Sequence, residues 1–296
     1  MTSVADLVPS AGALRAALDD VGYLADEGIA TALFCAVRLP QPLLLEGEPG
    51  VGKTEAAKAL ADVLDTPLIR LQCYEGIDAA EALYEWNFPR QMLAIKVAES
   101  AGSSVSEEDL FGREYLIGRP LLRAVEHPGP RPAVLLIDEI DRADDEFEAF
   151  LLELLGEGSV TIPELGTIRA THTPVVILTS NRTRDLHDAL KRRCLYHWID
   201  FPSTERTTAI IRRRVPGATE SVASQVAAAV RRLRALDVQK VPGVAEAINW
   251  VRALELLGLP VLDEAAVAMT IGSVLKYRED LELALERGPV WVAGPA

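Results

Sequence analysis

The sequence predicts an α/β protein, in which a parallel sheet covered by helices on both faces is followed by a smaller all-helical domain. Short apolar runs rich in β-forming residues recur at 43–45, 68–71, 134–137, 175–178 and 195–201. Helical patterns separate most of these runs, and such alternation is typical of parallel sheets. After Phe201 and Pro202 only helical patterns follow. We therefore expect an α/β domain over 1–202 and a helical domain over 203–296.

Size, charge and cysteine content restrict the function classes. The chain has 296 residues, of which 49% are hydrophobic and 5% aromatic, and its net charge is −14. Its apolar runs are far shorter than the ~20 residues of a membrane span, and its start lacks the pattern of a secretory signal. The acidic charge repels nucleic acid, and few aromatic side chains are available to stack on bases. Three separated cysteines, Cys35, Cys73 and Cys194, fit reduced thiols in a cytoplasmic protein.

Capping and breaker residues divide the last third of the chain into helices. Ser203 is a suitable N-cap for a helix through Arg213, and further helical patterns cover 221–236, 244–257 and 263–275. Two arginine clusters lie in the first two of these helices, at 212–214 and at 231, 232 and 234. They form either a local basic strip or, as is more common for charge runs, the solvated faces of two helices.

The most specific motif is a glycine-rich loop between the first apolar run and an alanine-rich helical segment. It consists of Gly47, Glu48, Pro49, Gly50, Val51, Gly52, Lys53 and Thr54, followed by Glu55. A strand, a glycine loop and a helix N-terminus in this order form a phosphate-binding loop. Its backbone N–H groups surround the β-phosphate, Lys53 reaches the β- and γ-phosphates, and the Thr54 hydroxyl binds Mg²⁺. The chain is therefore expected to bind a nucleoside triphosphate.

Two acids, Asp138 and Glu139, end the apolar run 134–137. Carboxylates at the carboxyl end of a buried strand lie where open α/β sheets bind their ligands. Asp138 is expected to hold Mg²⁺, often through water, and Glu139 to orient and deprotonate the water that attacks the γ-phosphate. The alternative is a helix N-cap. The separation from Lys53 leaves room for the intervening strand and helices, which favours the catalytic role.

The segment after the acidic pair predicts a helix and then a hairpin. Apolar residues at helical spacing form a stripe over 147–155 that ends at Gly156 and Gly158, and we interpret this stripe as core. Apolar residues then surround a turn with Pro163 and Gly166, which predicts a hairpin over 159–170.

Polar groups with a potential role in hydrolysis follow the hairpin. The strand 175–178 leads to Asn181, whose amide can hold the attacking water and sense the nucleotide; the alternative is a turn-forming residue. Arg192 and Arg193 end a helix before the last strand, a position that the helix dipole alone favours for cations. In a ring of identical subunits, this position faces the neighbour's nucleotide, where an arginine stabilises charge on the γ-phosphate. Arg193 is the first candidate for that role and Arg192 the second.

The segment 79–118 is predicted to be an insertion between strands. Helical patches at 81–86 and 92–99 are broken by Pro89 and by small residues at 102–104, and Ser106 begins a short capped helix. Such insertions either carry specificity or are mobile surface loops, and the residues leave both open.

Together these motifs resemble those of the AAA+ ATPases, over roughly residues 20–285. One branch of the AAA+ ATPases carries a hairpin just before the residue that senses the nucleotide, and the predicted hairpin before Asn181 resembles it. Within that branch, the amino-acid sequences of segments 43–61, 68–93 and 134–170 resemble those of the MoxR group, and most of all those of its CoxD-like members. The resemblance implies ATP as the nucleotide and a homo-oligomeric ring, of six subunits. It also implies a chaperone role in maturing a client such as a molybdenum hydroxylase, beside a partner with a von Willebrand A domain.

The chain departs from this family pattern in the helical lid. MoxR proteins usually carry an arginine in the first turn of the third lid helix, whereas this turn reads Val244, Ala245, Glu246 and Ala247. Either Arg252 or one of the arginines at 212–214 replaces the missing group, or the lid couples to nucleotide without a basic contact.

Three functions are compatible with the motifs. The leading hypothesis is a ring-forming, Mg²⁺-dependent ATPase that remodels a protein client through the loops 91–106 and the hairpin 159–170. The second is a nucleotide-dependent binding module with negligible turnover, which Glu139 and Asn181 disfavour because a pure switch needs no aligned water. The third is a DNA-acting motor, which the acidic charge disfavours.

Overall fold

The computed structural model describes residues 7–39 and 41–294 and forms two compact units. The first unit comprises the described parts of 1–17, 26–46 and 57–197, and the second those of 18–25, 47–56 and 198–296. The second unit therefore combines the last third of the chain with two short segments from the N-terminal part. The domain boundary near residue 203 stays a prediction.

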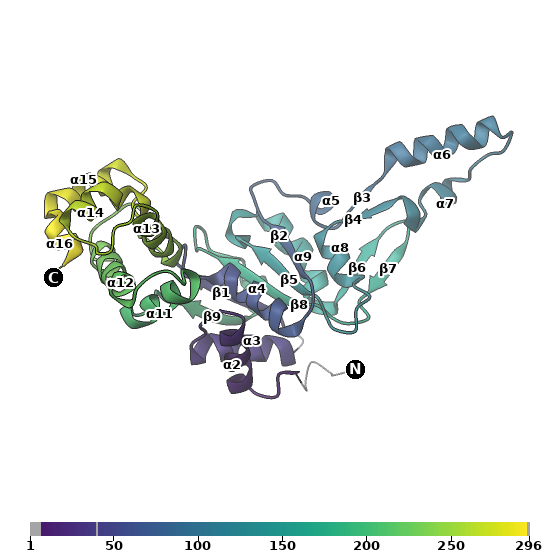
Figure 1. The fold of residues 1–296 in the computed structure, drawn as a ribbon. Helices are drawn as coiled ribbons and strands as arrows, with labels where there is room; N and C mark the ends of the chain where they lie inside the picture. The colour runs from purple at the N-terminus through teal and green to yellow at the C-terminus, as the bar shows by residue number, and fades with distance from the viewer. Residues whose placement is uncertain (1–6, 40, 295–296) are drawn as a thin grey trace. The chain divides into compact units, whose positions relative to one another are not determined.

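The largest sheet among the described residues is parallel and has five strands (Figure 1). Its strands follow the order β2 (Leu68–Gln72), β5 (Val134–Asp138), β8 (Val175–Ser180), β1 (Leu43–Gly47) and β9 (Leu195–Ile199). The register pairs Gln72 with Asp138, and Glu46 with Ser180. The carboxyl ends of neighbouring strands therefore lie together at one edge. The predicted α/β class is confirmed, and β9 ends two residues before the predicted Phe201.

The three central strands of the sheet, β5, β8 and β1, are buried on both faces, as their apolar residues predict. Leu135 and Ile137 of β5 face one hydrophobic core, and Val134 and Leu136, which alternate with them, are also fully buried. The helices of this part of the chain are α2 (Ala11–Asp20), α3 (Glu27–Arg38), α4 (Lys53–Leu64), α8 (Pro120–Val125), α9 (Asp145–Glu157) and α10 (Asp188–Lys191). In these three central strands, polar side chains lie only toward the carboxyl ends.

The insertion contains a pair of strands where one helical patch was predicted. Its elements are α5 (Ala79–Ala82), β3 (Tyr84–Trp86), α6 (Phe88–Ser100), α7 (Glu107–Leu110), a 3₁₀ turn (Arg113–Tyr115) and β4 (Leu116–Gly118). The prediction of a helix over 81–86 was wrong because Trp86 packs edge-on against Phe111 in a strand paired with β4. Pro89 lies in the first turn of α6, where proline is tolerated, and so does not break it. The short helix after Ser106 is confirmed.

The helix and hairpin after the acidic pair are confirmed. In α9, Phe147, Leu151, Leu154 and Leu155 are buried, and Gly158 ends the helix in the left-handed conformation. The strands β6 (Ser159–Ile162) and β7 (Gly166–Arg169) then pair antiparallel. The stripe of α9 is therefore part of the core.

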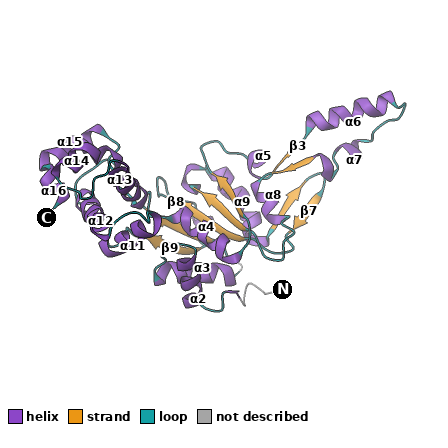
Figure 2. Ribbon diagram, viewed as in Figure 1, coloured by secondary structure: helices purple, strands orange, loops and turns teal. Residues whose placement is uncertain are grey.

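Helices alone make up the regular structure of the described residues from 200 to 294 (Figure 2). They are α11 (Thr204–Arg214), α12 (Glu220–Arg234), α13 (Val244–Leu256), α14 (Glu264–Thr270), α15 (Arg278–Arg287) and α16 (Pro289–Ala293). Ser203 caps α11, as predicted. The last predicted helix, 263–275, is shorter because the chain tightens into a 3₁₀ turn at Ile271–Ser273. These helices share a hydrophobic core. Trp250 is fully buried in it and donates a hydrogen bond to Thr270 at 2.7 Å.

The arginine clusters of α11 and α12 make contacts within the second unit. Arg213 donates to the carbonyl oxygen of Asp19 at 2.9 Å, and Arg232 to that of Val292 at 2.8 Å. Arg234 donates to the carbonyl oxygen of Pro242 at 2.8 Å and stacks on the Phe201 ring. These side chains therefore bind neighbouring segments of the chain.

Two further findings concern the cysteines and the membrane. Cys35, Cys73 and Cys194 all carry free thiols, as predicted. Across residues 7–39 and 41–294, none of the helices has the combination of length and apolar character that crossing a bilayer requires.

Candidate functional site

The glycine loop between β1 and α4 closes around the side chain of Lys53. Lys53 is buried, and its Nζ donates hydrogen bonds to the carbonyl oxygens of Gly47 at 2.7 Å and of Glu48 at 2.9 Å. Gly50 and Gly52 have φ angles of 78° and 102°, which strain any residue with a side chain. The loop thus fixes an ammonium group at its centre, where an anion can bind.

The other predicted residues of the loop are accessible or lie in the first turn of α4. Glu48, Pro49 and Gly50 are exposed, whereas the Val51 side chain is buried. Thr54 is half-buried in the first turn. Glu55, next to it, forms an ion pair with Arg214 of α11 at 2.6 Å. The strand, loop and helix predicted from the sequence are therefore all present.

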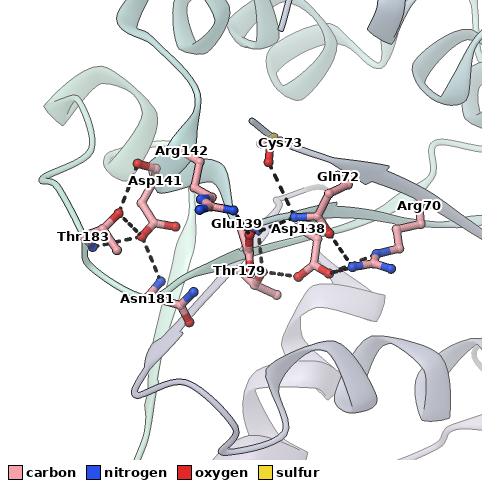
Figure 3. Close-up of polar contacts among 10 residues, drawn as sticks. All are labelled: Arg70, Gln72, Cys73, Asp138, Glu139, Asp141, Arg142, Thr179, Asn181 and Thr183. Atoms are coloured by element: carbon pink, nitrogen blue, oxygen red, sulfur yellow. Dashed lines mark hydrogen bonds and ion pairs between the residues drawn. The ribbon is translucent and has the colours of Figure 1, made fainter. Parts of the chain in front are cut away.

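Asp138 ends β5 as a buried carboxylate with a partner on each oxygen (Figure 3). Its side chain is only 4% exposed. One oxygen, Oδ2, accepts hydrogen bonds from Nε and Nη2 of Arg70 at 3.0 and 2.6 Å, and the other, Oδ1, accepts one from the Thr179 hydroxyl at 2.5 Å. Arg70 and Thr179 come from the strands on either side of β5, so the sheet itself fixes the carboxylate.

Glu139 is held in an uncommon backbone conformation. Its φ and ψ are 56° and 50°, the left-handed region that residues with side chains rarely adopt. Its N–H donates to the Thr179 hydroxyl at 2.9 Å, and its carboxylate accepts from Gln72 at 3.0 Å and from Arg142 at 3.2 Å. Thr179 therefore contacts both acids and fixes the turn between them. A strained residue that is held in this way is a candidate for function.

Asn181 follows β8, and its main chain is fixed by a third acid, Asp141. The Asp141 Oδ2 accepts hydrogen bonds from the N–H groups of Asn181 at 3.2 Å and of Thr183 at 2.9 Å. Asp141 is 2% exposed, so this anchor is inside the protein. Figure 3 shows that Asp138 and Glu139 belong to one hydrogen-bonded polar group at the carboxyl end of β5, and that Asn181 belongs to a second, with Asp141 and Thr183, at the carboxyl end of β8.

The sequence alone did not identify the supporting residues Arg70, Gln72, Asp141 and Thr179 as part of the site. Arg70 and Gln72 alternate with apolar residues in β2, and Arg70 also donates a hydrogen bond to Gln72. That alternation predicts a strand with one solvent-facing side, so it gave no signal that Arg70 contacts the buried Asp138. The contact of Thr179 with both acids had no signal either.

Arg192 and Arg193 belong neither to the polar group around Asp138 and Glu139 nor to the one around Asp141. Both are exposed beyond the end of α10, and Nη1 of Arg193 donates to the carbonyl oxygen of Ala189 at 3.0 Å. This contact of Arg193 is that of a cation at a helix C-terminus.

The donor chemistry fits Mg²⁺ that arrives with a nucleotide. Among the described residues, no group of three or more His, Cys, Asp and Glu side chains could hold a metal ion. Mg²⁺ needs no such group, because it keeps several waters and uses one or two carboxylates together with substrate phosphates. The Asp138 carboxylate and the Thr54 hydroxyl are oxygen donors of the kind that Mg²⁺ prefers.

Cys73 follows β2 next to Asp138 but is not a nucleophile. Its N–H donates to the Asp138 carbonyl oxygen at 2.9 Å, and its side chain is fully buried. Burial, with further contributions from the charges of Asp138 and Asp141, raises the pKa of the Cys73 thiol to about 12. The thiol is therefore protonated at neutral pH and cannot act as a thiolate.

The fold and the glycine loop define a nucleotide-binding protein of the phosphate-loop class. Residues 42–194 match the family model "AAA domain (dynein-related subfamily)", and the chain belongs to this family. Members of this family are in general nucleotide-hydrolysing ATPases.

The chain is also similar to individual proteins over parts of their length. The chain is 34% identical to chaperone protein ClpB 2 of Parasynechococcus marenigrum over 142 residues, 47% of this chain and 13% of the relative. It is 26% identical to the 26S proteasome regulatory subunit 8 homolog of Schizosaccharomyces pombe over 273 residues, 86% of this chain and 54% of the relative. The chain thus spans from about an eighth to about half of the length of these relatives. The solved structure of the RuvB Holliday junction branch migration motor of Thermotoga maritima matches with a TM-score of 0.47 and 17% identity, over 92% of this chain and 71% of the other.

Proposed function

We propose that this chain is a Mg²⁺-dependent ATPase. The observation that carries the proposal is the acidic pair at the end of β5, in which neighbouring strands fix both Asp138 and Glu139. A chain that only binds nucleotide needs no group that aligns and deprotonates a water, so the fixed carboxylate of Glu139 favours turnover over binding alone. The preformed loop around Lys53 supports triphosphate binding.

Each predicted residue then has a separate part in hydrolysis. Lys53 and the N–H groups of 47–55 bind the phosphates, and Thr54 and Asp138 hold Mg²⁺, which neutralises charge on the β- and γ-phosphates when bound. Glu139 orients the attacking water and accepts its proton, and the Asn181 amide holds the same water. Gln72 and Arg142 fix the Glu139 carboxylate until the water is in place.

Two substitutions test the chemistry separately from binding. Lys53→Ala removes the ammonium group and should abolish binding of a fluorescent ATP analogue. Glu139→Gln keeps the shape but cannot accept a proton, so turnover should fall by about 10²–10⁴-fold while binding remains. Wild-type turnover in both variants would disprove the proposal, and wild-type protein that binds ATP without turnover would favour the binding module.

We further propose that the chain assembles into a ring of six subunits in which Arg193, with Arg192 as the second candidate, contacts the neighbour's nucleotide. Both side chains are exposed, which such a contact requires. Mixing Arg193→Ala with Glu139→Gln subunits tests this assembly, because each inactive variant supplies the group that the other lacks. Partial recovery of turnover is expected, and no recovery at any mixing ratio would contradict an arginine that acts across a subunit interface.

We propose that the chain remodels another protein, its client. The resemblance to the MoxR group and its CoxD-like members indicates which class of protein the client belongs to. On that basis the chain matures a molybdenum hydroxylase together with a partner that has a von Willebrand A domain. The ClpB relative is named a chaperone, which agrees with protein remodelling. A pull-down with the Glu139→Gln form in ATP should recover both proteins, compared with a Lys53→Ala control that cannot bind nucleotide. Recovery of neither would remove this part of the proposal.

A further inference from the structure

The first turn of lid helix α13 is bonded to the phosphate loop through the main chain. Val244, the first residue of α13, donates its N–H to the Gly50 carbonyl oxygen at 3.0 Å. The first N–H groups of a helix have no acceptor inside the helix, so they need one elsewhere. Here the phosphate loop supplies it, and both segments belong to the second unit.

This contact is possible only because two glycines face each other. A Cβ atom on Gly243 would lie 2.8 Å from the Gly50 Cα, and a Cβ atom on Gly50 would lie 3.0 Å from the Gly243 Cα. Carbon atoms that are not bonded to each other do not approach so closely without a shift of the backbone. The two backbones are therefore in direct contact, with no room for a side chain between them.

The glutamate in this turn holds the contact in place. The Oε2 atom of Glu246 accepts a hydrogen bond from the Gly243 N–H at 3.0 Å and lies 3.3 Å from the position of a Cβ on Gly50. Glu246 thus binds the N–H of the residue that precedes its own helix, at the point where the family resemblance led us to expect a basic residue. Arg234 is close enough for the charge of Glu246 to act on it, although burial is the larger effect and lowers the pKa of Arg234 to about 10.

A hydrogen bond to the Gly50 carbonyl also determines where the next N–H points. The Gly50–Val51 peptide is planar and trans, so its C=O and N–H groups point in opposite directions. Because the carbonyl oxygen points at α13, the Val51 N–H must point away from α13. The lid helix thereby fixes one of the loop amides that we assign to phosphate binding.

We propose that Val244 is a positioning residue, whose main-chain N–H couples the phosphate loop to the lid in place of a basic side chain. The inference rests on the proposed nucleotide binding and deepens it. A loop that reorients its amides around a phosphate moves the Gly50 carbonyl, and with it the start of α13. The lid, in turn, favours the loop conformation in which the Val51 N–H is correctly aimed.

The substitution Val244→Pro removes this donor and little else. Proline at the first position of a helix is well tolerated, since its missing N–H has no partner within the helix. The preceding residue, Gly243, has φ −85° and ψ −170°, an extended conformation that proline accepts in its neighbour. Val244→Ala is the matched control, because it shortens the same side chain and retains the N–H.

Two measurements report on the coupling. The first is the affinity for a fluorescent, non-hydrolysable ATP analogue with Mg²⁺, which should fall about fivefold in Val244→Pro, as for the loss of one hydrogen bond. The second is hydrogen exchange of the amides at 251–256 in α13 with and without the analogue. We expect wild type and Val244→Ala to show a nucleotide-dependent change there and Val244→Pro to show none. A purely structural role would alter exchange equally in both nucleotide states.

The outcomes separate this inference from the proposed function. If the wild-type chain fails to bind the analogue, the proposed function is wrong. If it binds, and Val244→Pro matches Val244→Ala in affinity and in exchange, the coupling alone is wrong. Should Val244→Pro not fold, Gly243→Ala decides the matter, since its methyl group pushes the Gly50 backbone away. Wild-type affinity and exchange in Gly243→Ala would overturn the inference.

Discussion

The acidic group of the first unit and the phosphate loop of the second are held in place by different chemistry. Asp138 and Glu139 are fixed by side chains, which come from β2, β8 and the turn after β5. The phosphate loop is fixed mainly through carbonyl oxygens and glycines, by Lys53 on its inner side and by the first turn of α13.

This difference determines what damages each region. Side-chain hydrogen bonds are lost when atoms are removed, so the acidic group should be sensitive to truncation and tolerant of substitutions that retain the polar atom. Close backbone contacts are lost when atoms are added, so the loop should be sensitive to a single methyl group. The comparison therefore predicts opposite kinds of damaging mutation in the two regions.

Gly47→Ala should have the largest effect. Gly47 has a φ of 155°, and a Cβ there would lie 2.3 Å from the carbonyl oxygen of Ile199, a backbone atom that cannot rotate away. We expect a loss of about 3 kcal/mol or more of unfolding free energy, because overpacking adds to backbone strain. Denaturant unfolding measures this loss, and binding of the ATP analogue measures whether the distorted loop still binds phosphate. Gly76→Ala is the control, since Gly76 has a φ of 83° with no atom within 4 Å of its Cβ position. Equal effects of the two substitutions would show that strain alone matters.

Thr179→Val should have the next largest effect, and it tests the side-chain region. Valine has nearly the same shape, but it removes the hydroxyl that donates to Asp138 and accepts from the Glu139 N–H. One acid oxygen and one N–H lose their partner, so turnover should fall at least about tenfold while analogue binding changes little. Thr179→Ser retains the hydroxyl and should stay close to wild type. The side-chain account would be wrong if serine were as harmful as valine.

The sequence was sufficient to predict the strands of the sheet and the glycine loop. Strand runs and the glycine loop depend on local pattern, and β1, β2, β5 and β8 begin where the apolar runs begin. The insertion was harder because Tyr84 and Trp86 become a strand through contacts with residues near 111–118. Pairing with a distant segment overrides local preference and cannot be read from spacing.

The supporting contacts of the site were only partly predictable. Asp138, Glu139 and Asn181 follow strands, and the rule that ligands bind at strand ends places them together. The choice of Arg70 and Thr179 as the partners of Asp138 depends on strand order and register, which the sequence does not specify. The bond from Val244 to Gly50 is harder still, because a main-chain donor has no signature in residue type.

Arg70→Ala should lower stability by a smaller amount. It removes the cation that contacts Oδ2 of the buried Asp138 carboxylate, but Arg70 itself is 49% exposed, so water replaces part of the interaction. We expect a loss of about 1–2 kcal/mol of unfolding free energy in denaturant experiments. Lys191→Ala is the control in the same unit: its pair with Asp185 is 3.6 Å long and exposed, so its loss should cost at most about 0.5 kcal/mol. Equal losses would mean that burial of Asp138 adds nothing to the pair.

The smallest expected effect concerns thiol reactivity. It shows whether the residues around Asp138 become accessible to solvent when their side-chain contacts are removed. Burial raises the pKa values of Cys73 and Cys194 to about 12, so at pH 8 only about one thiol in 10⁴ is ionised and alkylation of the folded protein should be slow. Because a raised pKa leaves the thiol protonated at lower pH, labelling should accelerate as pH rises toward that value. Cys73 is in contact with Asp138 through its N–H, whereas burial alone accounts for the shift of Cys194. Thr179→Val should therefore accelerate the labelling of Cys73 by iodoacetamide and leave the labelling rate of Cys194 unchanged. Mass spectrometry measures both rates. Equal acceleration at both cysteines would mean that the whole first unit loosens, and the side-chain contacts around Asp138 would then not form a separate local structure.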